Sequence, residues 1–151
     1  NDIPIGEMIK TELNESGDGS CMIVIATDAP LSARNLKRLA KRAPLGLART
    51  GSVMSNGSGD YVIAFSNAYT IPYRSGSTNK IPDLINDNYM TQFFQAVVEA
   101  TQEAVYNSLF MATDVTGFEG RTIKALPLEK VRNILSDYRI LRKSDETEHL
   151  E

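Results

Sequence analysis

The sequence predicts an α/β (or α+β) fold, of which this chain supplies only part. Segments with strand character and segments with helix character alternate along the 151 residues, as in folds that layer helices on a sheet. Residues 20–26 form an apolar run typical of a strand covered on both faces. Only two or three strands are expected, which are too few to form a stable sheet by themselves. We therefore expect the remaining strands to come from another polypeptide or from further sequence.

The N-terminal part predicts a loop that leads directly into this first strand. Residues 3–9 are a short apolar piece, and residues 14–19 read NESGDG, which is typical of a flexible loop. The strand begins immediately afterwards and ends at Asp28-Ala29-Pro30. A flexible segment therefore joins a buried strand without an intervening element.

A helix is expected next, with Ser32 as its N-cap, a kink at Pro44 and an end at Gly51. One face of this helix is apolar and the opposite face is basic. We expect the basic face to be solvated rather than to bind phosphate or nucleic acid, because the net charge is −3 and no aromatic residues are interleaved. The apolar face comprises Leu36, Leu39, Ala40, Ala43 and Leu47, and the basic face comprises Arg34, Lys37, Arg38 and Lys41.

The second half of the chain continues the alternation. Residues 61–69 predict a strand, and residues 70–88 a long connection of the kind that serves as a lid or an interface. A long helix is expected over 89–113, then a short strand over 122–125 and a final helix over 128–138. The long helix carries a broad apolar stripe expected to be core: Phe93, Phe94, Val97, Val98, Ala104, Val105, Leu109 and Ala112.

Composition narrows the class of protein. The chain is 42% hydrophobic and 23% charged, which is ordinary for a globular domain. Neither nucleic acid nor a membrane is an expected partner, since the net charge is slightly negative and no apolar run approaches the ~20 residues that span a bilayer. The single cysteine, Cys21, excludes an internal disulfide framework and favours a reducing compartment, so we expect the cytoplasm.

The only histidine is His149, in a polar C-terminal tail. With one cysteine and one tail histidine, the chain alone builds neither a structural zinc site nor a histidine-based triad. No metal or cofactor is expected. A catalytic nucleophile would have to be activated in another way.

The pair Gly19-Ser20 could provide a nucleophile that is activated without a histidine. An N-terminal nucleophile enzyme needs a scissile bond in a loop, followed by Ser, Thr or Cys at the head of a central strand. The amine that cleavage frees has a reference pKa near 7.7–8.0 and can act as the base for its own hydroxyl. Taken alone, however, a Gly-Ser pair before an apolar run is common.

Two other features compete with this interpretation. The glycines of Asn56-Gly57-Ser58-Gly59-Asp60 would let backbone N–H groups approach an anion, but the loop lacks the lysine and spacing of a Walker sequence. A turn before the next strand is the favoured interpretation. Cys21 is interpreted as a small buried hydrophobic residue rather than a reactive thiol.

The sequence around Ser20 resembles the start of the catalytic chain in the L-aminopeptidase/D-esterase family, which includes the β-peptidyl aminopeptidases. The resemblance covers most of residues 19–127, and its first two blocks are the most specific. The matching segments are GSCMIVIATDAPL (19–31), LKRLAKRA (36–43), LGLARTG (45–51), NGSGD (56–60), IAFS (63–66), VVEAT (97–101) and GRTIKALP (120–127).

This resemblance implies a precursor that cuts itself into a larger α-chain and a smaller β-chain, and a four-layer αββα sandwich. Ser20 then corresponds to the nucleophile and Gly19-Ser20 to the processed bond. Ser58 matches a serine that hydrogen-bonds around the nucleophile and its amine, and Asp60 matches an acidic position that helps set the charge and orientation of the site. Both are expected catalytic residues, and the implied segments are residues 1–19 (end of the α-chain and processing loop), 20–140 (catalytic β-chain) and 141–151 (polar tail).

The implied activity is hydrolysis of N-terminal residues from small peptides, amides or esters by acyl transfer. The implied partners are the larger α-chain, which supplies the side-chain donor of the oxyanion hole, and further copies in an oligomer of αβ units. Two alternatives remain. An acyl transferase of the ornithine acetyltransferase type shares the fold but has threonine at the nucleophile position. The second alternative is a non-catalytic or unprocessed precursor or fragment with a structural role. An uncut Ser20 would have no free amine to activate its hydroxyl.

Overall fold

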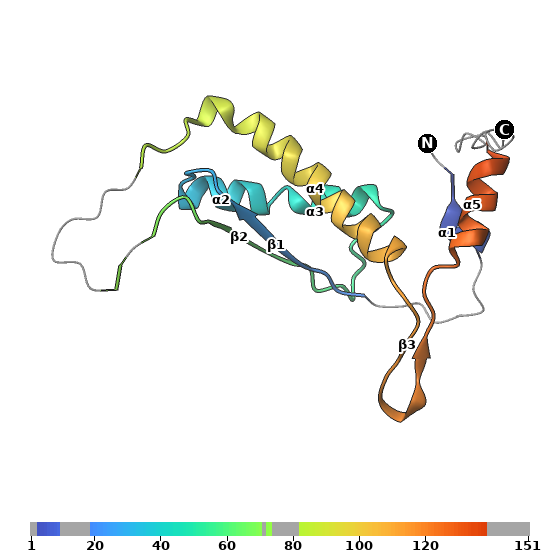
Figure 1. Ribbon diagram of the computed structural model, residues 1–151. Helices are drawn as coiled ribbons and strands as arrows, with labels where there is room; N and C mark the ends of the chain where they lie inside the picture. The colour runs from blue at the N-terminus through green and yellow to red at the C-terminus, as the bar shows by residue number, and fades with distance from the viewer. Residues whose placement is uncertain (1–2, 10–18, 71, 74–81, 139–151) are drawn as a thin grey trace, which may run out of the picture. The chain divides into compact units, whose positions relative to one another are not determined.

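The computed structural model describes residues 3–9, 19–70, 72–73 and 82–138 (Figure 1). The chain divides into two compact units, one formed by Asn1–Ser16 with Leu109–Glu151 and the other by Gly17–Ser108. Residues 14–18 of the loop expected over 14–19, residues 71 and 74–81 of the connection expected over 70–88, and the whole 141–151 tail lie outside the described residues. The second unit holds the candidate site.

A parallel pair of strands forms the sheet of this unit. Strand β1 (Met22–Thr27) pairs with β2 (Tyr61–Ser66), in a register that runs from Met22 opposite Tyr61 to Thr27 opposite Ser66. Both strands alternate between exposed and half-buried residues. Helices cover only one face, so the prediction that the first strand is covered on both faces is not met by the residues the structure describes.

Two short helices replace the single kinked helix that the sequence predicted. Helix α2 (Ala33–Ala40) begins at Ser32, whose Oγ accepts a hydrogen bond from the Asn35 amide at 3.2 Å, as expected of an N-cap. Helix α3 (Ala43–Arg49) starts after a two-residue break. Pro44 lies in the first turn of this new helix, where its missing N–H costs nothing, and this explains why the kink is a break.

The long helix α4 (Met90–Phe110) follows a 3₁₀ turn, η1 (Asp87–Tyr89), and lies with α2 and α3 on the covered side of the sheet (Figure 1). The predicted core stripe is only half confirmed, because Val97 and Val98 are buried whereas Ala104 and Leu109 are exposed among the described residues. The buried core of the unit consists of Leu31, Leu39, Ala43, Met90, Val97 and Val98.

Helix α3 packs closely on α4 at Gly46. A Cβ atom added to this buried glycine would lie 2.4 Å from the carbonyl oxygen of Val98 and 2.8 Å from Cβ of Thr101. Only glycine therefore lets the two backbones approach as they do. The next glycine, Gly51, has φ of 101° and ends α3 in the left-handed conformation that glycine adopts readily.

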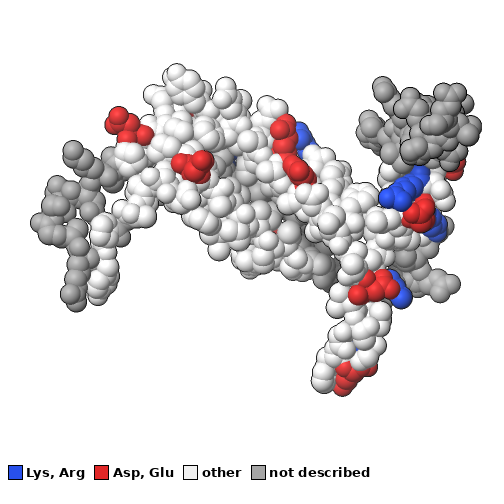
Figure 2. Space-filling model, viewed as in Figure 1, with Lys and Arg blue, Asp and Glu red and all other residues white. Residues whose placement is uncertain are grey.

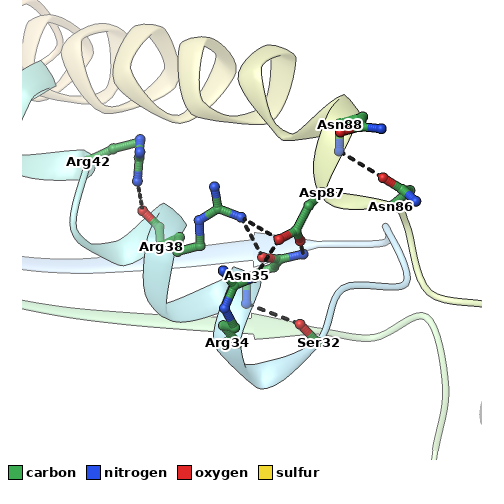
Figure 3. Close-up of polar contacts among 8 residues, drawn as sticks. All are labelled: Ser32, Arg34, Asn35, Arg38, Arg42, Asn86, Asp87 and Asn88. Atoms are coloured by element: carbon green, nitrogen blue, oxygen red, sulfur yellow. Dashed lines mark hydrogen bonds and ion pairs between the residues drawn. The ribbon is translucent and has the colours of Figure 1, made fainter.

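Asp87 ties the start of α4 to α2, and this contact uses part of the face that we expected to be solvated (Figure 3). The Asp87 carboxylate accepts hydrogen bonds from Arg34 and from the buried Asn35, the latter at 2.9 Å, and lies 3.4 Å from Arg38. The hydrogen bond from Arg34 is the main cause that lowers the pKa of Asp87, and the bond from Asn35 adds to it. Arg38 also lies over the ring of Phe94.

The first unit has its own small core. Helix α1 (Ile5–Ile9), which the sequence did not predict, packs on α5 (Leu128–Asp137) through Ile9, Val131 and Ile134. The expected short strand is present as β4 (Thr122–Ile123). It pairs antiparallel with a strand that we did not expect, β3 (Val115–Thr116), across the turn η2 (Phe118–Gly120). No helix in the described ranges is long and apolar enough to cross a membrane.

Candidate active site

The candidate site lies at the N-terminal end of the two-stranded sheet. Gly19 and Ser20 precede β1 and are separated from it only by Cys21, and Ser58 to Asp60 immediately precede β2. The strands are parallel, so both starts fall at the same edge of the sheet. The ladder fixes this alignment directly at its first bond, from the Tyr61 amide to the Cys21 carbonyl oxygen at 3.0 Å.

Ser20 is exposed, and its hydroxyl is held by the opposite loop. Its Oγ accepts a hydrogen bond from the backbone N–H of Gly59 at 3.0 Å. This contact joins residues 39 positions apart in sequence. It fixes the side chain that the sequence singled out as nucleophile.

Ser58 bridges the Gly19 carbonyl and the Asp60 carboxylate. Its Oγ lies 2.8 Å from the carbonyl oxygen of Gly19 and 2.7 Å from Oδ2 of Asp60. A hydroxyl carries one proton, so it donates to only one of these two acceptors at a time. An ionised carboxylate is the stronger acceptor, so the proton favours Asp60 when the Gly19 carbonyl is an ordinary amide.

Asp60 uses both carboxylate oxygens and is half-buried. While Oδ2 contacts Ser58, Oδ1 accepts the backbone N–H of Cys21 at 2.8 Å. The carboxylate therefore anchors the backbone of Cys21, the residue directly after Ser20. It connects the head of β1 to the loop before β2 in addition to the ladder.

The structure thus brings together all four residues that the sequence singled out: Gly19, Ser20, Ser58 and Asp60. Sequence reasoning missed the two backbone donors, the amides of Gly59 and Cys21. The family resemblance indicated Ser58 and Asp60 separately, and the hydrogen bond between them is seen only in the structure. No sequence pattern indicates which backbone N–H groups point at them, since that depends on the register of the strands.

The sequence of the chain is similar to that of a known peptidase family and of a curated aminopeptidase. The model of "Peptidase family S58" matches residues 1–123. The β-peptidyl aminopeptidase BapA of Sphingosinicella microcystinivorans is 45% identical over 126 residues, which are 83% of this chain and 32% of that protein. The chain therefore spans about a third of the length of this curated relative.

Solved structures also share the fold. The L-aminopeptidase D-Ala-esterase/amidase of Ochrobactrum anthropi, described as a prototype of the serine aminopeptidases with a variant of the Ntn hydrolase fold, matches with a TM-score of 0.66 and 35% identity. The match covers 78% of this chain and 33% of that one. A β-aminopeptidase of Burkholderia sp. matches with a TM-score of 0.70 and 30% identity, over 89% of this chain and 38% of that one.

These matches confirm the resemblance found in the sequence and the α/β class, of which the described residues supply a helix layer and part of one sheet. The family model extends over most of the chain and includes the whole candidate site. The chain therefore belongs to peptidase family S58.

Proposed function

We propose that this chain carries the catalytic part of a self-cleaving serine aminopeptidase or amidase, with Ser20 as the nucleophile. The observation that supports this most strongly is the arrangement around the Gly19-Ser20 bond. The Gly19 carbonyl oxygen lies 2.8 Å from the Ser58 hydroxyl, and the Ser20 hydroxyl is held at 3.0 Å by the Gly59 amide. A nucleophile, a carbonyl and a hydrogen-bond donor to that carbonyl meet at one peptide bond.

The proposed cleavage step is an acyl shift from nitrogen to oxygen. The Ser20 Oγ attacks the carbonyl carbon of Gly19, the C–N bond of Gly19-Ser20 breaks, and the nitrogen leaves as the α-amine of Ser20 after it gains the hydroxyl proton. Water then hydrolyses the ester, which gives a Gly19 carboxylate and restores the Ser20 hydroxyl. The Ser58 hydroxyl stabilises the negative charge that develops on the Gly19 oxygen.

In the proposed turnover step, the freed α-amine takes the proton of the Ser20 hydroxyl while Oγ attacks the substrate carbonyl. An acid near the ammonium form raises the pKa of this amine, and burial lowers it. Asp60 and Ser58 would orient the amine. The oxyanion hole, worth roughly 3 kcal/mol, would take its side-chain donor from the α-chain.

The proposed whole enzyme therefore contains more than this chain. Because the chain spans about a third of its curated relative, we propose that the larger α-chain of the same precursor completes the sheets and the substrate pocket. The proposed substrates are small peptides, amides or esters. The proposed assembly is an oligomer of αβ units.

Intact mass of the denatured protein, with N-terminal sequencing of each species, tests this proposal. The protein is expressed from its full coding region as wild type, as Ser20→Ala and as Ser55→Ala. The last is a control, because Ser55 is an exposed serine of the same loop as Ser58. We expect the wild type and the control to yield a chain that begins Ser-Cys-Met-Ile-Val, together with a chain that ends Asp-Gly.

We expect Ser20→Ala to remain uncut and to lose hydrolysis of amino acid amides. Efficient cleavage of Ser20→Ala at the same bond would overturn the proposal. A wild type that stays as one species and hydrolyses nothing would instead support a structural role.

A further inference from the structure

We propose that Gly59, Tyr61 and Met22 form the subsite for the side chain of the N-terminal substrate residue, the residue whose carbonyl Ser20 attacks. The ligand of this subsite is an apolar side chain, and Gly59 limits its size. This inference rests on the proposed function, since it takes Ser20 as the nucleophile of an aminopeptidase. Two features carry it: an open space between Gly59 and Ser20, and an apolar pair of residues that begins the two strands beside it.

Gly59 leaves an open space beside the Ser20 hydroxyl. A Cβ atom added to Gly59 would lie 3.6 Å from Oγ of Ser20 and 3.5 Å from Cε2 of Tyr61. Both are ordinary van der Waals distances, and φ of Gly59 lies outside the left-handed range, so neither packing nor backbone conformation requires glycine here. Gly46, by contrast, is required by packing, with a backbone oxygen 2.4 Å from the added Cβ. A side chain at position 59 would instead take away room next to the nucleophile.

The ring of Tyr61 borders this space and lies on the same face of the sheet as Met22. The two residues pair at the start of the ladder, and each is 64% exposed. Side chains alternate along an extended chain, so the exposed Ser20, two residues before Met22, belongs to this face as well. An aromatic ring and a thioether offer apolar contact, and charged side chains are sparse on the face of this unit seen in Figure 2. The surface beside Ser20 therefore suits an apolar group.

The path of the proton decides which part of the substrate lies there. In the proposed turnover, the α-amine of Ser20 takes the Oγ proton and passes it to the leaving nitrogen as the C–N bond of the substrate breaks. The leaving group must then lie on the side of the amine, where Gly19 precedes Ser20 in the uncut chain. The acyl part of the substrate extends the other way, toward the start of β1 and β2. Its side chain therefore meets Gly59 and Tyr61.

Only this end of the open face has to stay accessible. A reacting carbonyl carbon must come within about 3–3.5 Å of Oγ, so polypeptide packed tightly on Tyr61 and Met22 would close the approach to Ser20. Phe65 lies on the same face four residues along β2, roughly 13 Å from Tyr61 at about 3.3 Å per residue. At that distance the face can be covered without closing the site. The first pair is therefore assigned to the substrate, and the rest of the face to packing.

Hydrolysis of leucine p-nitroanilide and glycine p-nitroanilide by the protein expressed from its full coding region tests the subsite. The readout is the ratio of the two kcat/KM values, which does not depend on how much of a preparation is folded and cut. Gly59→Ala keeps the backbone N–H that binds Ser20 Oγ and adds one methyl group to the space. We expect it to lower the leucine-to-glycine ratio roughly tenfold, because the leucine side chain needs the room that glycine does not.

Tyr61→Ala removes the ring and should also lower the ratio roughly tenfold, whereas Tyr61→Phe keeps the ring and should preserve it. The matched control is Phe65→Ala, which removes an aromatic ring from the same face away from the site and should leave the ratio unchanged. An active wild type whose ratio is the same in Gly59→Ala and Tyr61→Ala would overturn the subsite and leave the proposed function standing.

A leaving-group series separates the two sides of the attacked carbonyl. If the ratio between leucine p-nitroanilide and leucine amide shifts in these variants while the leucine-to-glycine ratio does not, the leaving group lies on this surface and the assignment is overturned. If Gly59→Ala is not cut, Tyr61→Ala decides alone. A wild type that hydrolyses none of these substrates would refute the proposed function and the subsite with it.

Discussion

At the scale of single residues, the Ser58 hydroxyl links the parts of the candidate site, because it has two possible acceptors and one proton. It lies 2.8 Å from the Gly19 oxygen and 2.7 Å from Asp60. In the proposed attack of Ser20 on Gly19, negative charge would grow on the Gly19 oxygen, and that oxygen would become the better acceptor. The proton that first favours Asp60 would then be available where charge develops.

We therefore expect Ser58→Ala to slow cleavage of Gly19-Ser20 roughly 100-fold, the cost of one oxyanion donor. Ser58→Thr keeps a hydroxyl and should restore much of the rate, because the hydrogen-bond donor to the Gly19 carbonyl oxygen is retained. The cut fraction is followed over time by intact mass. A Ser58→Ala protein that is cut at the wild-type rate would remove Ser58 from the mechanism.

Asp60→Asn should leave the fold intact but lower turnover markedly. The amide oxygen can still accept the Cys21 N–H, so the contact that anchors β1 survives while the negative charge is lost. Thermal unfolding followed by circular dichroism reports on the fold, and kcat on an amino acid amide reports on the charge. Unchanged kcat would exclude a role for the Asp60 charge.

At the scale of helices and strands, the contact between α3 and α4 at Gly46 leaves no room for a larger side chain. Gly46→Ala would place Cβ 2.4 Å from a backbone oxygen of α4, so the helices must separate. We expect a loss of about 1–3 kcal/mol in the free energy of unfolding, measured by urea denaturation. The matched control is Gly6→Ala in α1, where nothing lies within 4 Å, and it should be neutral or slightly stabilising.

The contact between α2 and the start of α4 should depend on pH. The pKa of Asp87 is lowered in the folded state, chiefly by the hydrogen bond from Arg34. A lowered carboxyl pKa stabilises the fold above the ordinary value of 3.8, and this contribution is lost as the pH falls through the lowered pKa. The difference in urea midpoint between wild type and Asp87→Asn should therefore be present at pH 6 and shrink below about pH 3.8.

The same elements show what the sequence could and could not predict. The N-cap at Ser32 and the strands beginning near Cys21 and Tyr61 depend on local chemistry, and all three were predicted. The break after α2 was predicted as a kink, because only packing decides whether the chain bends or restarts at Pro44. Of the β3–β4 pair, only β4 was predicted. The strands are two residues long, so they show no hydrophobic periodicity that would identify them.

For the candidate site, the sequence indicated the right side chains but not the geometry. The resemblance pointed to Ser20, Ser58 and Asp60, and the parallel register is what places them together. The backbone donors at Gly59 and Cys21 depend entirely on that register, so no residue type reveals them.

At the scale of the whole molecule, the open face of the β1–β2 sheet is the dominant feature of the second unit. Its apolar side chains are 47–64% exposed: Met22, Val24, Tyr61, Ile63 and Phe65. Contiguous apolar surface of this kind marks an interaction site or causes aggregation. A chain that exposes it is incomplete as a folded layer.

We expect residues 1–151 expressed alone to self-associate and to bind a hydrophobic dye such as ANS. The double substitution Val24→Thr with Ile63→Thr, at paired positions on the open face, should lower both dye fluorescence and the sedimentation coefficient. Val53→Thr is the control, because Val53 is 84% exposed in a loop and should change neither. An unchanged double variant would show that this face does not cause association.

The bond from the Cys21 amide to Asp60 has a consequence for the order of events in the proposed maturation. Freshly created chain ends usually fray. This anchor lies one residue beyond the proposed cut, so cleavage removes the peptide link to Gly19 without removing the hold on Cys21. The new N-terminus at Ser20 would therefore already be in position when the cut is made. Assembly of the site would precede its activation, and the cut would switch on a geometry inherited from the precursor.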